Sequence, residues 1–116
     1  MIHENHRERV KRRFLIEGLD NFEPHNVLEL LLFYSIPQRD TNELAHELIE
    51  RFGSLSEVFD ASFDDLISVP GIKEHSAVLI KMVPALSRRY ALEKNHTTAP
   101  LSSMEKIGEY LSLIHI

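Results

Sequence analysis

The stretch Val27–Tyr34 constrains the fold of this chain more than any other part of the sequence. It reads VLELLLFY, and Glu29 is its single charged residue. A helix built from such a run is apolar on nearly every side, so it is stable in water only when neighbouring elements cover most of it. Pro24 suits the first turn of this helix. The sequence therefore predicts a buried central helix from about Pro24 to Ser35.

Helical signals recur along the rest of the chain, and strand signals are missing. Val, Ile and Thr form no alternating run of strand length, and no Asn-Gly or Asp-Gly hairpin turn occurs. Capping residues mark the expected boundaries: Gly53 ends one helix, and Asp40–Thr41, Ser54 and Ser62 open the next ones. We therefore predict an all-α fold, a compact bundle of five to six short helices. These helices are expected over about 5–17, 24–35, 41–52, 55–59, 63–69 and 74–93.

Two finer expectations concern the first and the last helix. In the first helix, Val10, Phe14 and Leu15 are expected to face inward, and Gly18 is a natural stop after it. In the last helix, Pro84 lacks a backbone N–H and is expected to kink the axis.

The composition changes after Lys94. Residues 95–100 read NHTTAP, which is typical of a linker. A brief amphipathic stretch follows from about residue 102, and it is too short to pack alone. We therefore predict one helical domain over residues 1–94, followed over 95–116 by a linker and the beginning of another element.

Composition excludes several classes of protein. With 43% hydrophobic and 27% charged residues, the 116-residue chain is typical of a globular domain and not of a disordered one. The absence of cysteine excludes disulfides, thiolate nucleophiles and cysteine-bound metal. The N-terminus is polar where a signal peptide is apolar, and the run Leu30–Tyr34 is too short to cross a bilayer. We expect a cytoplasmic protein without membrane contact.

The net charge of −5 is distributed unevenly. Residues 1–13 carry five basic and two acidic side chains (+3), residues 14–72 carry two and twelve (−10), and residues 73–94 carry five and two (+3). A polyanion is therefore expected to meet the first and third of these blocks. Solvated helix faces produce the same pattern, so charge alone leaves both interpretations open.

The segment Val69–Ser76, which reads VPGIKEHS, is the strongest candidate for a binding site. Gly71 allows a sharp turn, and Ile72 is expected to point back as an apolar plug. The N–H groups at the turn and at the start of the next helix are expected to lack internal partners, and with the helix dipole they suit a phosphate. A purely structural helical hairpin is the competing interpretation. The residues expected to contact phosphate are Gly71, Ile72, Lys73, His75 and Ser76.

No pattern points to catalysis or to a bound metal. The seven histidines form no HExxH pattern, and no HxHP element is present. The carboxylates lie in capping positions or on exposed faces and leave no acid–base pair, and the four glycines form no phosphate-binding loop. We expect no catalytic residue, no metal and no cofactor, and we interpret all seven histidines as surface or capping residues.

Longer patterns resemble known families. The patterns LxxRFGSL (48–55), ASxxDL (61–66) and VPGI (69–72) resemble paired helix-hairpin-helix domains such as the C-terminal modules of UvrC and XPF nucleases. The rest of the chain closely resembles the N-terminal domain of the bacterial DNA repair protein RadC family. The segments that carry this second resemblance are HRER (6–9), RRF (12–14), LELLLFYSIP (28–37), RDTN (39–42) and VPALSRRY (83–90).

The resemblance covers about residues 3–92 and implies a paired helix-hairpin-helix fold and a link to DNA repair. Members of the RadC family carry a C-terminal JAB/MPN domain with a zinc site built from a glutamate and an HxHPSG element. This chain is expected to be truncated where that domain begins and to lack its hydrolase activity. Lys73 replaces the second glycine of the family's Gly-Ile-Gly. The earlier turn, Ile36–Arg39, contains no glycine, which leaves Arg39 as its phosphate contact.

Two functions from different classes follow. The first is a non-catalytic, sequence-independent DNA-binding module, in which the 71–76 segment and Arg39 are helped by the basic blocks. The second is a protein-interaction or scaffold domain that keeps the fold without binding DNA, with a protein partner or self-association. The acidic middle, Lys73 and the glycine-free turn favour the second function, whereas the basic blocks and the Pro-Gly-Ile turn favour the first. The helping basic residues are Arg7, Arg12, Arg13, Arg88 and Arg89.

Overall fold

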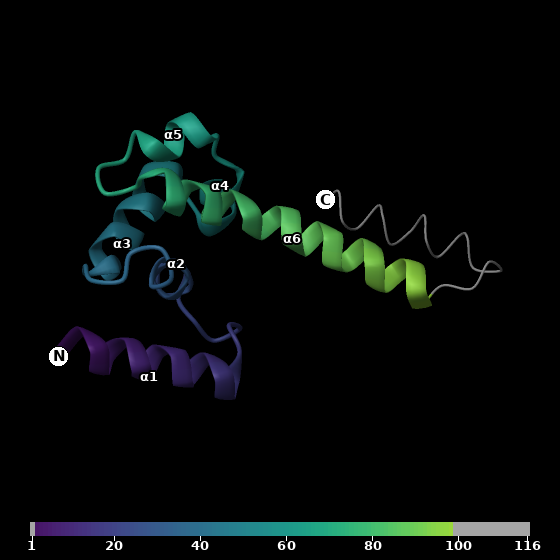
Figure 1. Ribbon diagram of the computed structural model, residues 1–116, viewed down its shortest axis with the longest axis horizontal. Helices are drawn as coiled ribbons and strands as arrows, with labels where there is room; N and C mark the ends of the chain where they lie inside the picture. Colours follow the sequence, from purple (N-terminus) through teal and green to yellow (C-terminus); the bar gives the residue numbers. More distant parts are fainter. Residues whose placement is uncertain (1, 99–116) are drawn as a thin grey trace. The chain divides into compact units, whose positions relative to one another are not determined.

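Six α-helices make up the described part of the chain, and no strand occurs within it (Figure 1). The structure is a computed structural model that describes residues 2–98. The chain divides into two compact units, residues 1–81 and 82–116, so that the last helix begins in the first unit and continues into the second. The predicted all-α class is confirmed. The helices are α1 (Ile2–Glu17), α2 (Pro24–Leu32), α3 (Thr41–Phe52), α4 (Leu55–Asp60), α5 (Phe63–Ile67) and α6 (Glu74–Thr98).

Side chains at the N-termini of α3, α4 and α5 fix where these helices begin, as the sequence predicts. The Asp40 carboxylate accepts a hydrogen bond from the Asn42 N–H at 2.9 Å. The hydroxyls of Ser54 and Ser62 accept from the N–H groups three residues later, at 3.2 and 3.1 Å. Each cap of this kind stabilises its helix by about 1 kcal/mol. Gly53 ends α3 with a φ of +108°, a value that side chains with a Cβ rarely adopt.

The helix α2 is the central helix of the first unit, as its apolar sequence predicts. Leu28, Glu29 and Leu32 are at most 1% exposed, and α2 packs against α1, α3 and α4. The main core joins α2 to side chains from every later helix. Its buried members are Leu28, Leu32, Ala45, Leu48, Val58, Leu66, Val69, Ile72, Ala77 and Ile80.

The predicted end of α2 at Ser35 is wrong by three residues. The N–H groups of residues 33–35 bond to carbonyls three residues back, at 3.1 to 3.2 Å, so the chain tightens into a turn after Leu32. Such bonds satisfy carbonyls that the end of a helix otherwise leaves open. Tyr34 is 69% exposed and does not extend the buried face of α2.

The last helix, α6, is longer than the sequence predicts. It continues through residues 95–98, which we expected to be a linker, because none of these polar residues breaks a helix. Pro84 lies inside α6 without ending it, and the expected kink stays a prediction. The amphipathic stretch and the remainder of the predicted 95–116 segment lie outside the described residues. None of the six described helices combines the length and apolarity that crossing a bilayer requires.

The helix α1 packs on α2 mainly through polar side chains. Phe14 and Leu15 are 39% and 80% exposed, so the prediction that they face inward is wrong. The contacts of α1 with α2 and its surroundings come from His6, Arg7 and Val10. Phe14 follows Val10 by four residues on the same face but lies beyond the covered part, and Leu15 lies off this face. Val10 lies against a second, smaller core formed by Phe22, Leu30 and Phe33.

Candidate nucleic-acid interface

The second turn, Val69–Lys73, joins α5 to α6 and has the shape that its Pro-Gly-Ile sequence predicts. Gly71 has a φ of +98°, and an added Cβ would meet the Leu44 methyl groups at 3.4 and 3.5 Å. Ile72 is 3% exposed and belongs to the main core, so it locks the turn onto the helices. The Ile72 N–H donates to the Val69 carbonyl at 3.0 Å. The expectation that this N–H lacks an internal partner is therefore wrong.

The N-terminus of α6 has no capping side chain, unlike those of α3, α4 and α5. Lys73 directly precedes the helix, and an ammonium group can donate hydrogen bonds but cannot accept them. Within the described residues, the N–H groups of Gly71, Lys73, Glu74 and His75 donate to no protein group. The side chains of Lys73 and His75 are both exposed. Open N–H groups at the positive end of a helix dipole favour an anion.

Lys73 stands where the family resemblance implies a second glycine, and its backbone is not strained. No residue other than glycine has a positive φ in the described part of the chain, so Lys73 has an ordinary backbone conformation. A glycine is therefore not required there by the geometry of this turn.

Ser76 has a structural role. It is 3% exposed, and its hydroxyl lies 2.9 Å from that of Ser35 at the end of the turn after α2. The two hydroxyls link this turn to α6 inside the protein. The expected contact between the Ser76 hydroxyl and a phosphate has no support, because this group does not reach the surface.

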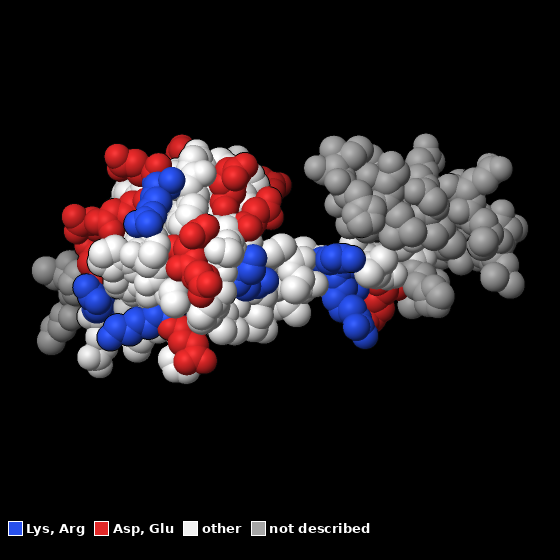
Figure 2. All heavy atoms as spheres, turned by 90° about the horizontal axis from the view of Figure 1, so that it is seen from above, with Lys and Arg blue, Asp and Glu red and all other residues white. Residues whose placement is uncertain are grey.

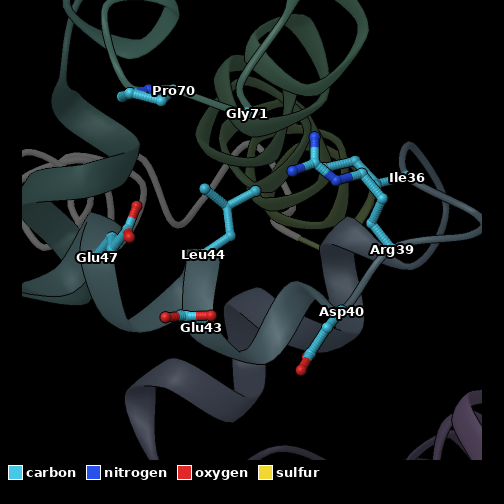
Figure 3. Close-up of a pocket in the computed structure, with 8 residues that line it drawn as sticks. All are labelled: Ile36, Arg39, Asp40, Glu43, Leu44, Glu47, Pro70 and Gly71. Atoms are coloured by element: carbon cyan, nitrogen blue, oxygen red, sulfur yellow. The ribbon is translucent and has the colours of Figure 1, made fainter.

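The first turn, residues 33–40, meets the second turn at a cavity of about 250 Å³. Leu44 points from α3 toward Gly71, and the Arg39 guanidinium is directed toward the second turn, whereas the Asp40 carboxylate points away from it (Figure 3). The fold thus brings two of the predicted site residues, Arg39 and Gly71, to one cavity. Its lining consists of Ile36, Arg39, Asp40, Glu43, Leu44, Glu47, Pro70 and Gly71.

Arg7 holds the first turn together instead of presenting its charge to solvent. Its Nη1 donates to the Phe33 carbonyl at 3.1 Å, and its Nη2 donates to the carbonyls of Ile36 and Arg39 at 2.7 and 2.6 Å. The guanidinium carbon also lies 4.5 Å from the centroid of the Phe33 ring. These contacts occupy the guanidinium that we expected to help bind DNA.

The other predicted arginines fall into three groups. Arg13 is used within the fold: it donates to the Asn21 carbonyl at 2.9 Å and lies 4.4 Å from the Phe22 ring centroid. Arg12 is exposed on α1, beside a shallow hollow that Arg9 also lines. Arg88 and Arg89 are exposed on the part of α6 that belongs to the second unit.

The sequence did not indicate the pair formed by the half-exposed His6 and the buried Glu29. Glu29 is 1% exposed, and its carboxylate lies 2.8 Å from His6 Nε2 and accepts a bond from Asn26 at 3.3 Å. The available signal was Glu29 itself, a charged residue inside the apolar run Val27–Tyr34, because a buried charge needs a partner. His25 and His46 form a second unforeseen pair, with stacked rings 3.9 Å apart. Across the described residues, no three potential ligands gather for a metal ion.

The comparisons with known proteins identify a homologue. The chain is 42% identical over 83 residues to the UPF0758 protein FN0909 of Fusobacterium nucleatum, a match that covers 72% of this chain and 36% of that protein. The chain thus spans about a third of the length of the relative that it matches. No protein-family model matches the chain, and no solved structure matches it.

Proposed function

We propose that this chain is a non-catalytic module that contacts the phosphate backbone of DNA through the N-terminus of α6. The observation that carries the proposal is the open group of backbone N–H donors at Gly71, Lys73, Glu74 and His75, with the Lys73 ammonium beside them. Homology to a UPF0758 protein supports it, because UPF0758 designates the RadC family, which is linked to DNA repair.

Contacts of this kind bind phosphate oxygens and carry no information about base sequence. The Lys73 ammonium and the α6 dipole supply the attraction, and Ile72 keeps the turn rigid from its place in the core. Arg39 reaches toward the same turn from the other side of the cavity and can meet a neighbouring phosphate. The exposed Arg12, Arg88 and Arg89 add attraction at longer range.

The interaction should be weak and depend moderately on salt. Two or three phosphate contacts correspond to a loss of affinity of about ten- to fortyfold between about 50 and about 200 mM salt. Glu74 directly follows the second turn, and Glu43 and Glu47 of α3 line the cavity beside it. These carboxylates limit the number of phosphates that can approach.

Fluorescence anisotropy with labelled single-stranded, duplex and branched DNA tests the proposal. Lys73→Glu should weaken binding at low salt by about tenfold, since it reverses the charge at the open N–H groups. Arg9→Glu changes the net charge equally at a residue outside the proposed contact and should weaken binding by no more than two- to threefold. Absence of binding to all three DNA forms at low salt, or equal losses in the two variants, would refute the site.

A second candidate function is protein recognition. It is favoured by the cavity between the two turns, where three carboxylates accompany the single Arg39. Acidic side chains also outnumber basic ones on the face of the first unit that is seen from the side of α4 and α5 (Figure 2).

A further inference from the structure

The cavity between the two turns combines an apolar floor with an acidic wall. Leu44 and Ile36 supply methyl groups to its surface, and Pro70 and Gly71 enclose it from the second turn (Figure 3). Asp40, Glu43 and Glu47 carry three negative charges against the one positive charge of Arg39, which leaves a formal balance of −2. A volume of about 250 Å³ equals that of about eight water molecules in the liquid, which is room for one long side chain.

Glu43 and Glu47 are the carboxylates free to act in this cavity. They lie four residues apart on α3, so their side chains are neighbours on one face of the helix. Both are exposed, and no ion pair within the described residues includes either of them. The Asp40 carboxylate, by contrast, caps α3 and points away from the second turn. Two like charges at this spacing repel each other, and a cation between them removes the repulsion.

The walls of this cavity are held in place before any ligand arrives. Arg7 fixes the carbonyls of Ile36 and Arg39, and Ile72 anchors the second turn in the core. A preformed cavity of this kind lowers the entropic cost of binding. The repulsion from Glu43 and Glu47 disfavours a phosphate in the cavity itself.

We propose that this cavity receives a single lysine or arginine side chain from a segment of a partner protein. The methylene groups of the side chain cover Leu44 and Ile36, and its charged end lies between Glu43 and Glu47. Arg39 at the other end of the cavity repels a second basic residue and favours an acidic one next to the bound side chain. The partner is therefore a protein segment of mixed charge, not a polycation. Its charged group is held by Glu43 and Glu47, which take no part in the proposed DNA contact, although Arg39 and Gly71 belong to both sites.

A pair of peptides that differ in one charge tests the proposal. The probe is Ac-Ala-Glu-Arg-Ala-Ala-NH₂, and its control carries citrulline, which is nearly the same shape without charge, in place of arginine. In amide NMR titrations of the full chain, the arginine peptide should produce saturable shifts at residues 43–47 and at Gly71. The citrulline peptide should bind at least fivefold more weakly, because it cannot pair with the two carboxylates.

Variants then assign the effect to the two carboxylates. Glu43→Gln with Glu47→Gln should weaken the arginine peptide by fivefold or more. Glu57→Gln with Asp60→Asn, two exposed carboxylates on α4, changes the net charge equally and should leave binding within twofold. Equal binding of the two peptides, no saturable shifts, or equal losses in the two double variants would overturn the proposal. Because none of these variants touches Lys73, the result is independent of whether the chain binds DNA.

Discussion

Replacing Arg7 by alanine separates a structural role of this arginine from a role in binding DNA. The substitution removes three hydrogen bonds from a guanidinium to carbonyls, at 2.6 to 3.1 Å, and one contact with the Phe33 ring. A buried hydrogen bond to a charged group contributes about 1.5 to 3 kcal/mol, and an exposed cation–π contact about 0.5 to 1 kcal/mol. Arg7 is half-buried, so water can replace part of what is lost. We therefore expect the free energy of unfolding to fall by about 2 to 3 kcal/mol.

Urea unfolding followed by far-UV circular dichroism measures this change. For a domain of this size, the expected loss corresponds to a fall in Tm of about 10 to 20 °C. Arg9→Ala is the matched control, because Arg9 is exposed on the same helix and should change stability by less than about 0.5 kcal/mol. Arg7→Lys should recover less than half of the loss, since one ammonium cannot span three carbonyls. A loss no greater than that of Arg9→Ala would refute the structural role.

Two further substitutions test the conformation of the second turn and the buried carboxylate. Gly71→Ala should lower the free energy of unfolding by about 1 to 2 kcal/mol, because its φ of +98° is strained for a residue with a Cβ. The Leu44 methyl groups lie at ordinary contact distance from the added Cβ and should add little. Gly53→Ala, with a φ of +108° and no neighbour, should therefore cost about the same. A much larger loss at Gly71, measured by thermal unfolding, would mean that packing dominates. His6→Ala should lower the free energy of unfolding by about 2 kcal/mol, because it leaves the buried Glu29 carboxylate with one weak donor. Adding Glu29→Gln should restore part of this stability, since a neutral amide is less costly to bury. A double variant no more stable than His6→Ala alone would contradict this account.

The parts of the fold that the sequence predicted correctly depend on neighbours in the chain. Asp40, Ser54 and Ser62 cap helices by accepting bonds from residues two or three positions away, and Gly53 ends α3 through its own backbone conformation. The buried character of α2 likewise follows from consecutive residues. Interactions of this range can be identified without knowing the tertiary structure.

Some errors are local, such as the end of α2 and the helical course of residues 95–98, but those that change the view of the site concern contacts between distant residues. Arg7 donates to carbonyls 26 to 32 positions later in the chain. A count of charges cannot distinguish such an arginine from one whose guanidinium is free to bind phosphate. Phe14 and Leu15 looked like core residues because they are apolar, but the contacts of α1 with α2 and its surroundings come from His6, Arg7 and Val10.

The candidate site was predicted in the same uneven way. Gly71 and Ile72 have the expected geometry, since a turn of this type follows from Pro-Gly-Ile itself. Ser76 is buried with its hydroxyl against that of Ser35, 41 positions earlier, a contact that could not be foreseen. The sequence indicated an acidic middle segment, but not that Glu43 and Glu47 line a cavity beside Gly71.

The position of Arg7 has a consequence for how this protein opens and closes locally. Its three acceptors belong to the first turn, which contains no glycine and is tied by these bonds to a helix that is remote in sequence. Whenever α1 detaches from α2, the first turn loses these bonds at the same moment. We therefore expect the two segments to open together, separately from the core around Leu48 and Ile80. Anything that loosens α1 thereby also changes the shape of the cavity between the turns.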